Sequence, residues 1–281
     1  MKKLTKKIYR LFLPVLGILI FSCDTTPTAE ICVSIVPQSY LVKRIAGEQT
    51  PVTIMIPPGS GHSTHALTAA QIRDLHNSRL YVKVGHPDFN FEKKHIDPFL
   101  KQNLEIMTVS MADPKYNIPG DSHIWLSPRI MRGAAERIYI ALAELYPEKK
   151  GSYTNNYHSL IRDIDILDKE LQEILAAHQG AEFLTLHPAW GYFARDYGVR
   201  QVSIRDENKS FSAQRMAELI DYAKKNNIRI IFVQKEYAFE QIDVLAREIG
   251  AEVITLDPLS ASWLENLRST GRIISKVLNE Q

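Results

Sequence analysis

Histidines and one aspartate follow four segments of this 281-residue chain that have the pattern of β-strands, directly after the strand at His187 and Asp257 and well after it at His123. Imidazole nitrogens and carboxylate oxygens suit divalent first-row metals, above all zinc. The candidates are separated by 58, 64 and 70 residues, counted from His65, which is far too long for a zinc finger. The pattern therefore predicts a metal site that the fold assembles from distant loops. The candidate ligands are His62, His65, His123, His187 and Asp257.

Strand-like and helix-like segments alternate along the chain, which is typical of βαβ units with parallel strands. The expected strands are residues 31–36, 52–56, 80–84 and 105–109, then 183–186, 201–204, 228–233 and 253–256. Open parallel sheets bind ligands beyond the carboxyl ends of their strands, which is where the candidate ligands stand. Between the halves, residues 148–178 contain no proline and carry an apolar stripe at helical spacing, namely Leu160, Ile164, Leu167, Leu171 and Leu175.

The sequence thus predicts an α/β fold of two (βα)4-type lobes with parallel sheets, joined by one long rigid helix. We expect an N-terminal lobe at residues 30–146, a linking helix at 147–179 and a C-terminal lobe at 180–281. With 45% apolar and 23% charged residues, the composition is that of a globular protein and excludes a disordered chain. A formal charge of only +2 gives no support for nucleic-acid binding.

The first 22 residues have the order of an export signal. Five cations lie in the first ten residues, no acid occurs before Cys23, and the apolar segment 11–21 is too short to span a membrane. Residues 20–23 resemble the bacterial lipobox, which implies a lipoprotein signal peptide at 1–22, lipid on Cys23 and a flexible tether at 23–29. A plain signal peptide with an incidental cysteine, or a buried helix, is the alternative. We expect Cys32 in a core strand, without a disulfide.

Three sequence blocks resemble one family. Residues 121–128 are similar to its Asp-Pro-His-x-Trp-Leu-Asp-Pro block, residues 187–198 to its His-x-x-x-Gly-Tyr-Phe-Ala-x-x-Tyr-Gly block, and residues 255–259 contain its Asp-Pro-Leu. The chain thereby resembles the zinc/manganese type (cluster A-I) of solute-binding lipoproteins that serve ABC importers. The resemblance implies that His123, His187 and Asp257 bind the metal. It also implies a membrane permease as partner. We expect a lipid-anchored monomer outside the cytoplasm, on the periplasmic side or at the cell surface of a bacterium.

The first ligand stays open between two histidines. The family usually has its histidine four residues after a Pro-Gly pair, and a gapless match from Gly59 places Ser63 there. We favour His65, because residues 63–65 best match the family pattern, with His62 as the alternative. A nitrogen donor at His187 favours zinc, since the manganese-selective members tend to have a carboxylate at that position.

Three other functions are compatible with parts of the pattern: a manganese or iron carrier of the same importer type, a zinc hydrolase or lyase, and a metal-binding adhesin. Hydrolytic zinc keeps an open position for water, whereas here a carboxylate is available to fill it. The chain also has no HExxH motif. We therefore expect a zinc carrier without catalytic activity.

Overall fold

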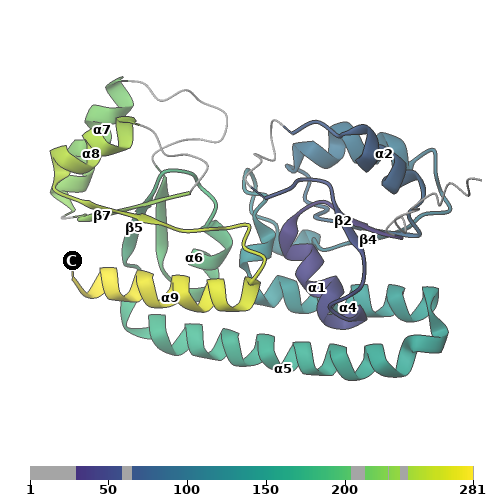
Figure 1. Cartoon of the computed structure of the whole chain (residues 1–281). Helices are drawn as coiled ribbons and strands as arrows, with labels where there is room; N and C mark the ends of the chain where they lie inside the picture. Colours follow the sequence, from purple (N-terminus) through teal and green to yellow (C-terminus); the bar gives the residue numbers. More distant parts are fainter. Residues whose placement is uncertain (1–29, 59–64, 204–212, 227, 235–239, 281) are drawn as a thin grey trace, which may run out of the picture.

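A computed structural model describes residues 30–58, 65–203, 213–226, 228–234 and 240–280 (Figure 1). The expected signal peptide and tether, Cys23 and His62 lie outside these residues. In the part of the chain that the structure describes, no helix is both long and apolar enough to cross a membrane.

The first half folds into a four-stranded parallel sheet with the order β2-β1-β3-β4. Its strands are β1 (Ile31–Val33), β2 (Val52–Ile54), β3 (Leu80–Lys83) and β4 (Met107–Ser110). Its α-helices are α1 (Val36–Ala46), α2 (Ala69–His76), α3 (Asp97–Leu100) and α4 (Pro128–Leu145). One π-helical turn, η1 (Glu92–Ile96), and two 3-10 turns, η2 (Pro114–Tyr116) and η3 (Ile124–Leu126), lie in the connections.

The second half repeats this topology, with the parallel order β6-β5-β7-β8. Its strands are β5 (Glu182–Thr185), β6 (Arg200–Ser203), β7 (Ile230–Val233) and β8 (Glu252–Thr255). Its helices are α6 (Gly191–Tyr197), α7 (Ala213–Lys225), α8 (Glu240–Ile249) and α9 (Trp263–Asn279). In each sheet the order in which strands are added reverses beside the first strand, between β1 and β3 and between β5 and β7. Such a switch point is where open α/β sheets bind ligands.

One long helix joins the two halves. After the 3-10 turn η4 (Pro147–Lys149), α5 (Lys150–Leu175) runs beneath both sheets and ends in the turn η5 (Ala176–His178) (Figure 1). Its predicted apolar stripe is buried against α1, α4 and α9. The predicted fold class, two parallel-sheet lobes joined by a long helix, is confirmed.

Local sequence signals explain where several helices begin. Ser127 caps α4 by accepting the backbone N–H of Ile130 at 3.2 Å, and Pro128 follows at a position that needs no N–H. The expected strand 31–36 is wrong in its second half, because β1 ends at Val33 and α1 begins at Val36. Pro37 lies in the first turn of α1, where its fixed φ favours a helix over a strand.

The two lobes share one apolar core. A single buried cluster extends from the first sheet through α5 to α6 and α9, and Cys32 lies in it, fully buried in β1 as expected. A second, smaller cluster lies between the second sheet and the helices α7 and α8. Because α5 and the inner helices of both halves pack into one core, the structure favours small adjustments of the loops over wide opening of the lobes.

A substitution at Leu171 tests whether the two lobes share one core. The Leu171 side chain is fully buried in α5 and would contact a β-carbon built at Gly271 of α9. We expect Leu171→Ala to lower the free energy of unfolding by about 2–5 kcal/mol through lost burial and the cavity left behind. Ile166→Ala is the matched control on the same helix, since the Ile166 side chain is 54% exposed. Urea denaturation followed by circular dichroism measures both, and equal effects would contradict a core that runs through α5.

Candidate metal centre

Two predicted ligands from opposite halves of the chain face each other. His123 lies at the start of η3 and is 2% exposed, whereas His187 follows β5 at its carboxyl end and is half-buried. Their Nε2 atoms are 3.2 Å apart, and their ring centroids are 5.0 Å apart with the planes at 79°. The fold therefore brings two imidazole nitrogens, 64 residues apart in sequence, to one point between the lobes.

Asp121 fixes the orientation of the His123 ring. Its Oδ1 accepts the backbone N–H of His123 at 2.9 Å and lies 2.7 Å from His123 Nδ1. When Asp121 is ionised it can only accept, so Nδ1 of His123 then carries the proton and the lone pair on Nε2 points toward His187. Burial lowers the pKa of His123 to about 3 and raises the pKa of Asp121 to about 7. A carboxylate behind a histidine in this way is the usual support of a metal-binding imidazole.

Helix α6 of the second half holds the loop that carries Asp121 and His123. The backbone N–H of Ile118 donates to the hydroxyl of Tyr192 at 2.8 Å, and Arg195 donates to the carbonyl of Tyr116 at 2.6 Å. The first residue of α6, Gly191, lies so close that a β-carbon there would come within 2.4 Å of Asp121 Oδ2. Glycine at this position therefore permits the close approach of α6 to the loop.

The remaining described candidates lie apart from this pair. Asp257 is exposed, and its Oδ1 accepts the backbone N–H of Leu259 at 2.9 Å. His65 is half-buried, with Nε2 at 3.4 Å from Gln71 Oε1 and its ring beside Phe91. Within the described ranges, no three His, Cys, Asp or Glu side chains are placed so that they could hold one ion. The four-ligand set of the sequence analysis thus remains a prediction, of which the structure assembles His123 and His187.

Two residues near the site, Asp121 and His86, were not among the functional residues predicted from the sequence. Asp121 belongs to the block quoted for His123, but its spacing two residues earlier does not by itself indicate a contact. His86, three residues beyond β3, is 3% exposed, and its Nδ1 accepts the backbone N–H of Asp88 at 3.0 Å. Its ring meets that of Tyr192 edge-on at 6.4 Å, and burial lowers its pKa. The position of His86 shortly after the strand β3 is the sequence signal that could have indicated a place near the site.

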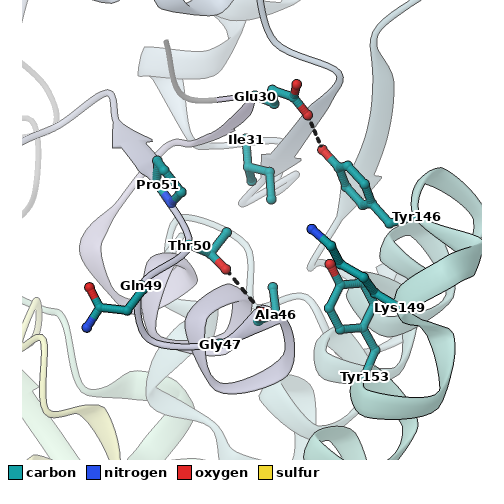
Figure 2. A pocket seen from close by; sticks show the side chains of 10 residues that line it. All are labelled: Glu30, Ile31, Ala46, Gly47, Gln49, Thr50, Pro51, Tyr146, Lys149 and Tyr153. Carbon is teal, nitrogen blue, oxygen red and sulfur yellow. Dashed lines mark hydrogen bonds between the residues drawn. The ribbon is translucent and has the colours of Figure 1, made fainter. Parts of the chain in front are cut away.

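A well-formed pocket of about 440 Å³ lies elsewhere (Figure 2). Glu30 and Ile31, at the beginning of β1, line it together with Thr50 and Pro51, which precede β2. The Tyr146 hydroxyl donates to Glu30 across one wall at 2.6 Å. These residues stand at the amino ends of the strands, whereas His187 follows a carboxyl end. The pocket is therefore separate from the paired histidines.

Residues 31–277 match the family model of the zinc-uptake complex component A, a periplasmic protein named ZnuA. The chain belongs to the ZnuA family. The match covers both lobes and the linking helix, and it confirms the family resemblance that the three sequence blocks indicated.

Relatives of the chain are metal-binding proteins. The zinc-binding lipoprotein AdcA of Streptococcus pneumoniae serotype 4 is 26% identical over an aligned length of 295. The alignment covers 96% of this chain but only 58% of AdcA. A putative metal-binding protein of Chlamydia trachomatis is 28% identical and covers 87% of this chain and 90% of its own length. A zinc-bound crystal structure of a ZnuA deletion mutant, 33% identical, superimposes with a TM-score of 0.79 over 88% of this chain and 96% of that one.

The contact between Asp121 and His123 gives a direct test of the site. Asp121→Asn removes the charge behind His123 Nδ1, so we expect zinc affinity to fall by about 10–100-fold. Competition with a chromogenic chelator measures the change. Asp165→Asn, at an exposed position on α5, is the control and should leave the affinity unchanged. An unchanged affinity in Asp121→Asn would show that this carboxylate does not support a metal ligand.

Proposed function

We propose that this ZnuA-family chain captures Zn²⁺ between its lobes outside the cytoplasm and delivers it to the permease of an ABC importer. The observation that carries the proposal is the 3.2 Å separation of the Nε2 atoms of His123 and His187. A tetrahedral zinc ion with Zn–N bonds of about 2.0–2.1 Å holds two nitrogens about 3.3 Å apart. The two imidazoles therefore stand almost at the spacing that one zinc ion requires.

The other proposed ligands are Asp257 and one loop histidine, His65 or His62. Asp257 follows β8 in the same half as His187, and its exposed carboxylate accepts the backbone N–H of Leu259. If the side chain of Asp257 rotated away from this N–H and bound the metal instead, the site would have three nitrogen ligands and one oxygen ligand. Because the lobes share one core, we propose that loading orders the loops and shifts the lobes only slightly.

Zinc is the favoured cargo over manganese because nitrogen donors predominate in the proposed set, and manganese suits oxygen-rich sites. Catalysis is disfavoured because the carboxylate of Asp257, as a proposed ligand, would fill the position that a hydrolytic zinc leaves open for water. The metal-binding character of the relatives supports a carrier in preference to an enzyme. Manganese binding tighter than zinc binding, or zinc-dependent hydrolysis of esters or hydration of CO2, would favour the alternatives.

The N-terminal sequence supports an attachment to the membrane through lipid on Cys23. Cys23 lies seven residues before Glu30, where the described chain begins. An extended chain of that length spans about 23–25 Å, so lipid on Cys23 would keep the carrier close to a membrane permease. The resemblance of residues 20–23 to a lipobox supports this anchor, and the family match supports the transporter partnership.

Calorimetry of purified mature chain tests the function. Zinc should bind with one-to-one stoichiometry, and His123→Ala and His187→Ala should each weaken binding by more than the 10–100-fold typical of residues that only support a ligand. His158→Ala is the control, because His158 is exposed on α5. Wild-type-like zinc binding in both variants would refute the proposed site.

A second pair of variants decides the first ligand. His65→Ala should lower zinc affinity strongly and His62→Ala weakly, since residues 63–65 match the family's residue pattern better. Cobalt substitution adds a spectroscopic measure, because the visible absorption of Co²⁺ reports the number and kind of its ligands. The opposite order of the two variants would assign the position to His62, and no effect of either would exclude this loop from the site.

A further inference from the structure

Two tryptophans donate hydrogen bonds across the boundary between the lobes. The indole N–H of Trp125, in η3, donates to the carbonyl oxygen of Pro258 at 2.7 Å. The indole N–H of Trp263, the first residue of α9, donates to the carbonyl oxygen of Trp125, also at 2.7 Å. Both side chains are buried, 0% and 1% exposed. Because no water reaches these groups, separation of the loops would leave buried donors unsatisfied.

This tryptophan pair lies between two proposed zinc ligands. Trp125 comes two residues after His123, and the centroids of their rings are 5.1 Å apart. Pro258 directly follows Asp257 in the chain. The side chain of Trp125 therefore packs against His123 and also donates a hydrogen bond to Pro258, the residue next to Asp257.

The segment that carries Asp257 depends on such bonds. The carboxylate of Asp257 accepts the N–H of Leu259, within the same loop. The backbone carbonyl oxygen of Asp257 accepts a hydrogen bond from the side-chain amide of Asn266 at 2.6 Å. Asn266 lies on α9, one turn after Trp263. The ring of Trp263 also packs against Tyr40 of α1, with centroids 6.1 Å apart. The start of α9 is thus fixed to the first lobe, and the Asp257 segment is fixed to α9 and to Trp125.

We infer that Trp125 is a positioning residue that couples His123 to the Asp257 segment, so that the carboxylate of Asp257 reaches a zinc ion already held by His123 and His187. A loop held in place loses less conformational freedom when its side chain binds, and this raises affinity. Without the indole N–H, the Asp257 segment would have to be ordered by the zinc itself. The inference rests on the proposed zinc-binding function.

Trp125→Phe is the direct test, because phenylalanine retains an aromatic ring but lacks the N–H. We expect zinc affinity to fall by about 10–100-fold, as for other residues that support metal ligands, with faster zinc release to a chelator in stopped-flow measurements. Trp263→Phe removes the reciprocal donor from the other lobe and should act in the same direction. It carries the test alone if Trp125→Phe does not fold.

A double-mutant cycle with Asp257→Ala separates positioning from a purely structural role. Once the carboxylate is gone, loss of the indole N–H should change zinc affinity by less than about threefold, because the two residues act as a unit. Additive losses would overturn the inference, since they would mean that Trp125 acts independently of Asp257. The same cycle with Trp263→Phe gives an equivalent answer.

Tyr197→Phe is the matched control. It also removes one buried donor, the hydroxyl that bonds Asp168 at 2.8 Å between α6 and α5, but away from the proposed ligands. It should lower the melting temperature without changing zinc affinity. Unaltered zinc affinity in both tryptophan variants would overturn the inference and leave the proposed function standing. Failure of the unaltered chain to bind zinc would overturn both.

Discussion

The close approach of His123 and His187 is the constraint on which the proposed site depends. Two imidazole nitrogens 3.2 Å apart must be supplied by loops from different sheets, so an error of about an ångström in either lobe would remove the pair. Asp121 fixes the ring of His123 from behind, and Gly191 permits the close approach of α6 to the Asp121 loop. The geometry of the pair is thus a property of the interface between the lobes.

The rest of the fold keeps that interface in place. Helix α5 packs against α1 and α4 from the first lobe and α9 from the second, and one apolar core runs through all of them. Protein interiors are close-packed and change in discrete steps, so wide opening of the lobes would break this core. Among the described residues, the exposed side chain of Asp257 and the smaller core beneath α7 and α8 lie outside these constraints and can adjust when metal enters.

Much of this arrangement could be predicted from the sequence, because it depends on local patterns. The apolar stripe from Leu160 to Leu175 indicated α5. The strand before His187 placed that histidine at the carboxyl end of a strand. The contact of Asp121 with His123 could not be predicted, because it depends on a short turn that no pattern specifies. The burial of His86 and the hydrogen bond from Trp263 to Trp125 also arise from packing between distant segments. Whether the loop histidine is His62 or His65 stays a prediction for the same reason.

A crystal structure of the zinc-loaded chain, with anomalous scattering recorded on both sides of the zinc edge, is the most direct test of the proposed site. We expect one strong anomalous peak between the lobes, about 2.0–2.1 Å from Nε2 of both His123 and His187. The carboxylate of Asp257 and one imidazole of the loop at residues 62–65 should complete a tetrahedron around it. A zinc ion bound elsewhere, or bound between the lobes without His123 and His187, would contradict it.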